Sequence, residues 1–344
     1  MTPSAEAAAE RLSRRHVGGV VGVLDLTTED LEVAAWGSTG RADDAPAEPQ
    51  TLFEIGSVTK TVTALALAVL VECRTVRLDT PLRTLLPDGT EVPRYGAAEI
   101  TLEHLARHTS GLPRSPTPIT HDLWVALVEA GNPYAELDEP TTLAGLAAIR
   151  LRQAPGTGRG RYSNLGAGLL GIALRRAAGV NSYAELAQQT VLGPLGLADT
   201  VVRPGSEQSA RLAQGHGSFG RPVADWYLEG LAGAGALRST VPDLLSYLRA
   251  QLDPESTPLA AAIRRTHVLW QPHRMQTIGL GWFRSRLRGG DVWWHNGGTG
   301  GFRSFAGFAP QRRRAVAVLV NDRRGPDRAG IDLLGLAIRS PKGS

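Results

Sequence analysis

Runs of strand-forming residues lie at both ends of the chain, and this placement limits the possible folds more than any other feature of the sequence. Near the N-terminus, residues 18–25 and 31–37 predict two strands joined by a short turn. Near the C-terminus, short aromatic or β-branched segments separated by turn residues predict an antiparallel meander over 278–287, 291–295, 302–309 and 314–321. Because both ends supply strands, we expect one antiparallel sheet built from the two termini.

The region between these strands is mostly helical in pattern, with many Pro- and Gly-rich loops. An exposed amphipathic helix is also expected at the N-terminus. The segment from Val62 to Val71 is apolar almost all round, so a helix there should be buried on every side. We expect the helical middle to pack beside the sheet as a second lobe, with a ligand cleft between the lobes. Further helices are predicted over 120–130, 142–152, 165–178, 182–190, 241–252 and 326–339.

The composition excludes several classes of protein. The chain has 344 residues, of which 42% are hydrophobic and 20% charged, and its net charge of +4 does not indicate nucleic-acid binding. No apolar stretch reaches ~18 residues, which argues against a membrane span. The N-terminal residues lack the pattern of a signal peptide, so we expect a cytoplasmic protein. The single cysteine, Cys73, follows an apolar run and is expected to be an inert, buried thiol.

The segment EIGSVTK, residues 54–60, places Ser57 three positions before Lys60, and only two of the 37 Lys and Arg residues are lysines. On a helix, residues at this spacing lie on the same face, about 5–6 Å apart. A serine hydroxyl needs a base to become a nucleophile. A buried lysine can lose its proton, whereas an arginine cannot. The pair therefore predicts a serine nucleophile at a helix start, where backbone N–H groups favour an oxyanion.

A second candidate pair, Tyr162 and Asn164, follows the turn APGTGRG and opens an apolar helix. A phenol and an amide at this spacing can enter the same cleft, and a phenol near a cationic lysine can act as phenolate or proton shuttle. Taken alone, the pair favours a surface aromatic residue at Tyr162 and a helix N-cap at Asn164 over a catalytic role.

A third motif lies in WWHNGGTGGFRSF, residues 293–305, where His295, Asn296 and Gly297 end an apolar strand. Glycine allows the backbone to approach a substrate closely. The N–H of the following Gly298 is a candidate second donor of an oxyanion hole. His-x-Gly alone is a weak signal, since His16-Val17-Gly18 also matches it.

In this order, the three motifs resemble those of the serine β-lactamase and penicillin-binding-protein superfamily. The resemblance is to its class C β-lactamase-like branch, which includes esterases, D-amino-acid peptidases and acyltransferases. It implies that Ser57 is the acylated nucleophile, Lys60 the base, Tyr162 a proton shuttle and Asn164 a substrate-orienting amide. His295-Asn296-Gly297 then corresponds to the third motif of the family in its His-x-Gly form.

The resemblance covers roughly residues 15–325 and implies an α+β fold of the β-lactamase/transpeptidase type. We expect a single domain over 1–344. Residues 1–75 and 272–344 should form an α/β lobe with the antiparallel sheet, and 76–271 mainly an all-helical lobe.

The main hypothesis is a serine hydrolase or acyl-transfer enzyme that cleaves an ester or amide of a small molecule through an acyl-enzyme on Ser57. The N–H groups of Ser57 and Gly298 would bind the oxyanion. Lys60 and Tyr162 would move the proton as a coupled pair, and the sequence does not assign the first transfer to either. At His295, true β-lactamases usually carry a lysine, so the substrate is left open.

Two alternatives follow from the same residues: a cytoplasmic transacylase that passes the acyl group to an amine or alcohol, and a non-catalytic binding or sensor module. A metal enzyme is disfavoured, because His104 and His108 at i, i+4 lack a nearby third ligand. No cofactor, nucleic acid or membrane partner is expected. Arg159, Arg161 and Arg303 are candidates for flanking the cleft and favouring an anionic substrate, or are surface charges.

Overall fold

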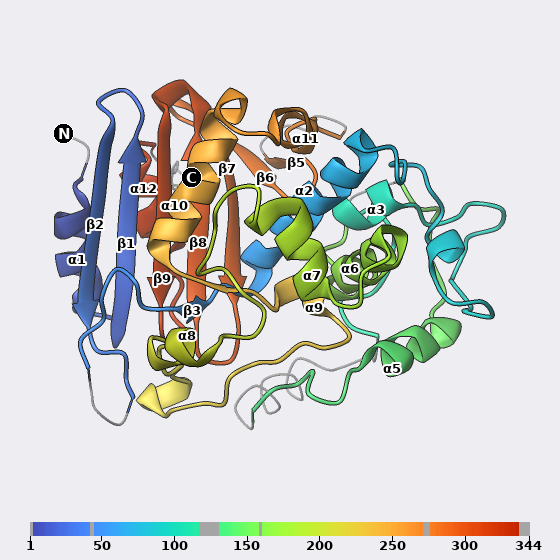
Figure 1. Cartoon of the computed structure of the whole chain (residues 1–344), viewed down its shortest axis with the longest axis horizontal. Coiled ribbons are helices and arrows are strands. Elements are labelled where there is room, and N and C mark those ends of the chain that lie inside the picture. Colours follow the sequence, from blue (N-terminus) through green and yellow to red (C-terminus); the bar gives the residue numbers. More distant parts are fainter. Residues whose placement is uncertain (1–2, 42–44, 117–130, 158–159, 271–275, 337–344) are drawn as a thin grey trace, which may run out of the picture.

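The computed structural model of the chain describes residues 3–41, 45–116, 131–157, 160–270 and 276–336. Within them, a seven-stranded sheet has the order β2-β1-β9-β8-β7-β6-β5 (Figure 1). Every neighbouring pair is antiparallel. The strands are β1 (Gly18–Asp25), β2 (Asp30–Gly37), β5 (Gln276–Ile278), β6 (Phe283–Leu287), β7 (Gly290–Gly298), β8 (Arg303–Ala309) and β9 (Arg314–Val320).

The two ends of the chain meet inside this sheet, because β1 pairs with β9 over the register Gly19↔Val320 to Asp25↔Arg314. The prediction of one sheet built from both termini is therefore confirmed. The predicted strand over 278–287 is two strands, β5 and β6. They are separated where the Gly281 N–H donates to the Ala106 carbonyl, 3.1 Å away, instead of to a strand.

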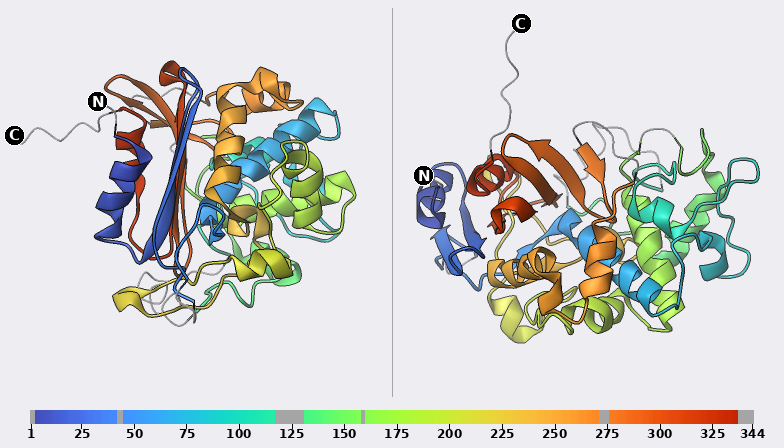
Figure 2. Two further views of the ribbon diagram at one scale, coloured as in Figure 1. Left: turned by 60° about the vertical axis from the view of Figure 1, so that its left-hand side comes forward. Right: turned by 90° about the horizontal axis from the view of Figure 1, so that it is seen from above.

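Helices cover both faces of the sheet (Figure 2). On one face lie α1 (Ala5–Ser13) and α12 (Asp327–Leu333), which form a small core with alternate residues of β1, β8 and β9. The N-terminal helix was predicted to be exposed, but the apolar side of α1 is buried in this core. On the other face, α10 (Val241–Leu252) packs on β1, β8 and β9, and α11 (Ala260–Thr266) packs against α2 (Thr59–Glu72). Between Val62 and Val71, every residue of α2 is buried except Val69 and Val71, which are half-buried. The all-round apolar pattern of this segment predicted that burial.

Of the helices that follow α2, α3 (Leu102–Ala106), α5 (Glu139–Ala144), α6 (Asn164–Ala178) and α7 (Tyr183–Ala187) lie on the side of α2 away from the sheet (Figure 1). Helix α8 (Ser206–Ala210) lies beside the short strand β3 (Phe53–Glu54) at the end of the sheet (Figure 1). The longest of these helices, α6, packs against α2 and matches the predicted helix at 165–178 to within one residue. A further short helix is α9 (Ala232–Gly235).

Some predicted elements differ from the structure. The helix predicted over 142–152 begins earlier as α5, because the Asp138 side chain caps it by accepting from the Thr141 N–H, and it passes into a 3-10 turn that ends at Ala148. The last predicted helix is shorter, since α12 ends at Leu333, and the helix predicted over 120–130 lies outside the described residues. Cys73 is exposed at the end of α2, so the buried thiol was a wrong expectation.

The described helices include none that is both long and apolar enough to cross a membrane. The division into lobes at residues 75/76 and 271/272 stays a prediction. Helix α10 lies within residues 76–271, which were assigned mainly to the helical lobe, but it packs on the sheet.

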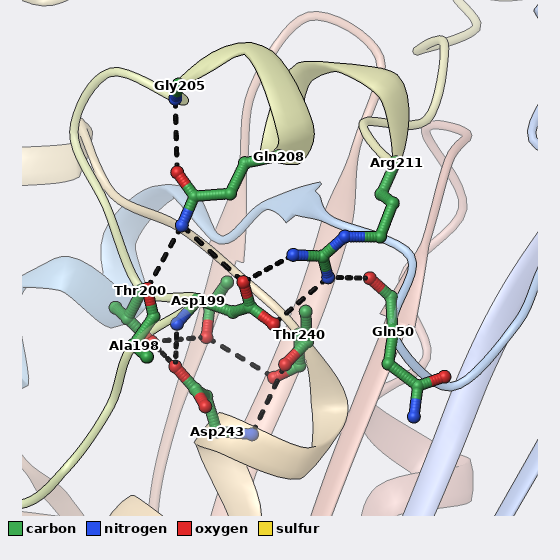
Figure 3. Close-up of polar contacts among 10 residues, drawn as sticks. Gln50, Ala198, Asp199, Thr200, Gly205, Gln208, Arg211, Thr240 and Asp243 are labelled. Atoms are coloured by element: carbon green, nitrogen blue, oxygen red, sulfur yellow. Dashed lines mark hydrogen bonds and ion pairs between the residues drawn. The ribbon is translucent and has the colours of Figure 1, made fainter.

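A polar network joins three segments that are distant in sequence (Figure 3). Asp199 forms an ion pair with Arg211 at 2.6 Å, and Arg211 also donates to the Gln50 carbonyl at 2.8 Å. The Asp243 carboxylate, in the first turn of α10, accepts from the Asp199 N–H at 2.9 Å and from the Thr200 hydroxyl at 2.8 Å. This network fixes the loop before α8 against α10 and against the segment that leads into the short strand β3 (Phe53–Glu54).

Candidate active site

Ser57 lies in a tight 3-10 turn, Gly56–Val58, between β3 and α2. It is half-buried, and the residues on both sides of it are buried. Gly56 has φ +48°, and a Cβ there would lie 2.7 Å from the backbone nitrogen of Gly298. A side chain at Gly56 would therefore separate the Ser57 turn from the end of β7, so glycine is required by this close approach.

Lys60 lies in the first turn of α2 and is 3% exposed. Its Nζ lies within hydrogen-bond distance of Ser57 Oγ, at 2.9 Å, and donates to the Ala234 carbonyl of α9 at 2.6 Å. Burial, followed by the positive charge of Arg114, holds the pKa of Lys60 well below its ordinary value. The geometry thus places a lysine that favours its neutral form against the hydroxyl of Ser57.

Tyr162 comes from the loop before α6, and its hydroxyl donates to Ser57 Oγ at 2.7 Å. The Lys60 Nζ lies 4.9 Å from the centre of its ring. Burial raises the pKa of Tyr162 to about 12, with the hydrogen bond to Ser57 opposing the shift. The phenol is therefore protonated at neutral pH, and of the two roles that the sequence left open for it, the phenolate is disfavoured.

Two histidines and a phenylalanine surround the Tyr162 ring. The His108 ring centre lies 4.5 Å from it, and those of His295 and Phe283 each lie 6.3 Å from it. His108 Nδ1 accepts from the Ser163 N–H at 3.3 Å, which fixes the loop that carries Tyr162. Burial lowers the pKa of His295 to about 3 and that of His108 well below its ordinary value, so both rings are neutral.

Asn164 is the first residue of α6, and the helix is capped by Ser163, whose side chain accepts from the Gly166 N–H. The N-cap role considered for Asn164 is therefore wrong. Its Nδ2 donates to the Tyr134 hydroxyl at 2.9 Å, and its Oδ1 is buried without a partner in the described part of the chain. Asn164 is thus held beside the site with one acceptor unused.

The third motif occupies the last residues of β7. Its His295 side chain faces Tyr162, and Nδ1 lies 2.6 Å from the Asn296 carbonyl. Side chains alternate along a strand, so the exposed Asn296 side chain lies on the opposite face, near Asp327. The structure therefore brings His295 to the site but not the side chain of Asn296.

Gly297 and Gly298 bring β7 against the turn that carries Ser57. A Cβ at Gly297 would overlap the Ile55 carbonyl oxygen, which also accepts from the Ser304 hydroxyl at 2.8 Å. The Gly298 backbone nitrogen lies beside Gly56, as described above. This position is compatible with an oxyanion donor, and the oxyanion role of Ser57 and Gly298 stays a prediction.

A short ribbon connects the residues on either side of the site. Strand β3 pairs with β4 (Arg238–Ser239), with Glu54 opposite Arg238, so the turn of Ser57 and the helix that contains Ala234 are joined at their bases. Glu54 and Arg238 form a buried ion pair at 2.9 Å, and Glu54 also accepts from the Trp226 N–H at 2.6 Å. Burial raises the pKa of Glu54 to about 7, and Arg238 opposes this shift.

Several residues at the site were not predicted from the sequence: His108, Arg114, Tyr134 and Phe283. His108 begins the segment HTSGLP, residues 108–113, and Arg114 follows it. This segment resembles the loop that follows the nucleophile helix in the same family, and that resemblance was the signal that could have found both residues. The His104–His108 chelating pair considered above is not formed, because His104 Nδ1 accepts from the Thr101 N–H in a capping box while His108 lies under Tyr162. Across the described residues, no group of three His, Cys, Asp or Glu side chains could hold a metal ion.

Comparisons with known proteins identify the family of this chain. A family model described as Beta-lactamase matches residues 5–338. The D-alanyl-D-alanine-carboxypeptidase/endopeptidase AmpH of Escherichia coli (strain K12) is 28% identical over 308 residues, covering 83% of this chain and 75% of AmpH. The esterase EstB of Burkholderia gladioli is 32% identical over 192 residues, covering 55% of this chain and 48% of EstB.

Solved structures have the same overall fold. The β-lactamase/D-alanine carboxypeptidase from Yersinia pestis, complexed with citrate, superposes with a TM-score of 0.78 at 27% identity. The superposition covers 96% of this chain and 93% of that one. The β-lactamase/transpeptidase fold predicted from the three motifs is therefore confirmed.

Proposed function

The chain belongs to the β-lactamase family, and from this premise we propose that it is a serine hydrolase that cleaves an ester or amide of a small molecule through an acyl-enzyme on Ser57. One observation carries the proposal: Ser57 Oγ lies 2.9 Å from Lys60 Nζ, close enough to pass it a proton, and accepts from the Tyr162 hydroxyl at 2.7 Å. A serine held by an amine that favours its neutral form and by a protonated phenol has a base and an acid within reach.

The acylation step follows from these protonation states. Ser57 Oγ forms a bond to the substrate carbonyl carbon while its proton moves to Lys60 Nζ, which becomes an ammonium group. The carbonyl oxygen becomes an oxyanion that the N–H groups of Ser57 and Gly298 are proposed to bind. The bond to the leaving group then breaks, and Tyr162 donates its proton to the departing oxygen or nitrogen and regains one from Lys60.

Deacylation reverses the same transfers with water as the nucleophile. Water attacks the acyl carbon and gives its proton to the Tyr162–Lys60 pair. The bond from the carbonyl carbon to Ser57 Oγ then breaks, and Ser57 recovers its proton. The products are the free acid and the enzyme in its starting state. Neither Lys60 nor Tyr162 needs a permanent charge for this cycle, which suits the buried setting of both groups.

Turnover of a short-chain p-nitrophenyl ester tests this function. The wild-type protein should release p-nitrophenol catalytically, and the Ser57→Ala variant, folded by circular dichroism, should release it at the rate of the buffer. An added amine that accelerates release and appears as an amide product would assign acyl transfer instead of hydrolysis. Equal turnover by the wild type and the Ser57→Ala variant would contradict the proposed nucleophile.

A further inference from the structure

Lys60, His108 and His295, the lysine and the two histidines that contact Ser57 or Tyr162, carry no fixed positive charge. Lys60 favours its neutral form, and His108 and His295 are neutral, all because burial disfavours their charged forms. The third motif therefore supplies a neutral ring at His295. Any anionic group of a substrate has to find its cation elsewhere at the site.

Arg114 supplies that cation. Its guanidinium carbon lies 5.4 Å from the centre of the Tyr162 ring, a cation–π contact on the ring that touches the nucleophile. Its charge helps to lower the pKa of Lys60, and it opposes the rise that burial causes in the pKa of Tyr162 and of Tyr134. Arg114 is exposed, so the guanidinium borders the site and also meets solvent.

The position of Arg114 is fixed by the helix that carries the second motif. Its backbone carbonyl accepts from the N–H groups of Asn164 and Leu165, each at 3.1 Å. The side chain thus starts from a point held against the first turn of α6. A cation anchored in this way loses less freedom on binding a substrate than one on a free loop.

Arg114 has no carboxylate partner among the described residues. Other arginines near the site are paired, as Arg107 is with Glu103 and Arg238 with Glu54. The arginines suspected from the sequence do not replace it. Arg303 donates to the carbonyls of Thr299 and Phe302, and Arg161, although exposed, contributes to no pKa shift of Lys60 or Tyr162. Arg159 lies outside the described residues.

We propose that Arg114 binds a carboxylate of the substrate, so that the preferred substrates are esters or amides that carry a carboxylate group. This proposal rests on the proposed function. A guanidinium presents several N–H donors in a planar fork that fits a carboxylate, which a neutral imidazole at His295 does not. The carboxylate belongs either to the acyl part or to the leaving group, and the experiment distinguishes the two.

Two matched pairs of esters test the proposal. Mono-p-nitrophenyl adipate carries its carboxylate on the acyl part, and its neutral partner is methyl p-nitrophenyl adipate. In the second pair, 4-acetoxybenzoate carries the carboxylate on the leaving group, and its neutral partner is methyl 4-acetoxybenzoate. The readout is the ratio of kcat/KM for the acid to that for its methyl ester, measured at low and at high salt.

The wild-type ratio should be about 10 in one of the two pairs. That pair shows whether the carboxylate belongs to the acyl part or to the leaving group. In Arg114→Gln the ratio should fall to about 1 or below, and Arg114→Lys should keep part of it. The matched control Arg161→Gln removes a neighbouring exposed charge and should keep the wild-type ratio. High salt should reduce the wild-type ratio, because an exposed charge is screened.

Three results would overturn the proposal: a wild-type ratio of 1 or less in both pairs, an unchanged ratio in Arg114→Gln, or an equal loss in Arg161→Gln. These results leave the proposed function intact as long as the methyl esters are hydrolysed by wild type and not by Ser57→Ala. If none of the four esters is turned over, the proposed function itself is contradicted, and the substrate proposal is contradicted with it.

Discussion

At the scale of single residues, one buried environment sets two opposite pKa shifts around Ser57. Burial lowers the pKa of Lys60 and raises that of Tyr162, because in both cases it disfavours the charged form. The amine thereby becomes available as a base, and the phenol stays an acid. The division of roles between the two residues follows from desolvation, without a neighbouring charged base.

Substitution of Lys60 separates its charge from its basicity. Lys60→Met removes the base, and Lys60→Arg keeps a cation that cannot release its proton. Both variants should acylate roughly 10²–10⁴-fold more slowly than wild type, the usual contribution of a general base. The rate of labelling by a fluorophosphonate measures this.

The stability of these variants supplies the control. Lys60→Met should unfold at the wild-type temperature or above, because methionine needs no desolvation of a charged form. If a variant loses both labelling and much of its stability, its slower labelling is a consequence of impaired folding. Near-normal labelling of Lys60→Arg would contradict the role of Lys60 as base.

The pH dependence of acylation has a defined sign. Because the pKa of Lys60 is lowered, the lysine is neutral and active above that pKa, and activity is lost as the pH falls through it. The rate of ester turnover should therefore be constant above that pKa and decline below it, with the decline centred well below the pKa of a free lysine. A rate that still rises up to about pH 10, near the pKa of a free lysine, would contradict this.

Arg114→Gln provides a check on the assignment of the acid limb. The charge of Arg114 contributes to the lowered pKa of Lys60. Its removal should move the acid limb of the rate profile to higher pH. An acid limb that stays in place in this variant would indicate that another group controls it.

Sequence motifs located the reacting side chains but not their surroundings. Ser57 and Lys60 could be predicted because their spacing on one helix determines their distance. His108 and Tyr134 lie in irregular segments, and only the tertiary fold brings them to Tyr162 and Asn164. The protonated state of Tyr162 also needed the structure, because it depends on burial.

At the scale of elements, the end of β7 and the β3–β4 ribbon hold the site. The end of β7 approaches the Ser57 turn so closely that Gly297 has no room for a Cβ beside the Ile55 carbonyl. The β3–β4 ribbon joins the same turn to α9, which supplies the acceptor for Lys60. These contacts require particular backbone distances, and the hydrophobic pattern of the strands does not encode them.

Alanine at the two glycines of β7 should have different effects. Gly297→Ala places a Cβ against backbone, so we expect a loss of about 1–3 kcal/mol in unfolding free energy, typical of overpacking, and slower acylation. At Gly298, a Cβ would lie 2.9 Å from the terminal nitrogen of Arg303, a flexible side chain that can move. Urea unfolding of both variants should show the smaller loss for Gly298→Ala. The reverse order would contradict the described packing.

The predicted elements were most accurate where a start signal and a regular pattern coincide. Strand β1 and helix α10 have the predicted bounds, and Thr240 caps α10 by accepting from the Asp243 N–H. The helix predicted over 142–152 was misplaced because its start signal, Asp138 with Pro140, was not used. Element ends without such signals depend on tertiary contacts, as at Gly281 between β5 and β6.

At the scale of the whole molecule, the sheet depends on both ends of the chain. Beside the β1–β9 pairing, His16 Nδ1 lies 3.0 Å from the Asp322 carboxylate, which also accepts from the Val17 N–H at 3.1 Å and the Arg324 N–H at 2.8 Å. Asp322 thus joins the entry of β1 to the exit of β9. The order of strands along the chain predicted this closure, and the particular residues that hold it did not stand out in the sequence.

Asp322→Asn tests this connection. Hydrogen bonds to the carboxylate, His16 included, hold the pKa of Asp322 below its ordinary value against the opposing effect of burial. Its contribution to stability is therefore present above the unfolded-state pKa and is lost as the pH falls through the folded-state pKa. The variant should lose about 1–3 kcal/mol of unfolding free energy at pH 7, and the difference from wild type should shrink in strong acid.

Asp79→Asn is the surface control for that measurement, because Asp79 pairs with Arg77 in full exposure to solvent. Its unfolding curve should be close to that of the wild type. Equal stability of Asp322→Asn and wild type at pH 7 would contradict the role of Asp322. The cytoplasmic location and the lobe boundaries stay predictions from sequence.

The most direct test of the central claim is the intact mass of the protein after reaction with a fluorophosphonate, followed by peptide mapping. The account predicts one adduct on the wild-type chain, located on Ser57, and none on Ser57→Ala. Three results would contradict the Ser57 acyl-enzyme. They are an adduct on another residue, an equal adduct on both proteins, and the absence of an adduct on a wild-type protein that hydrolyses esters.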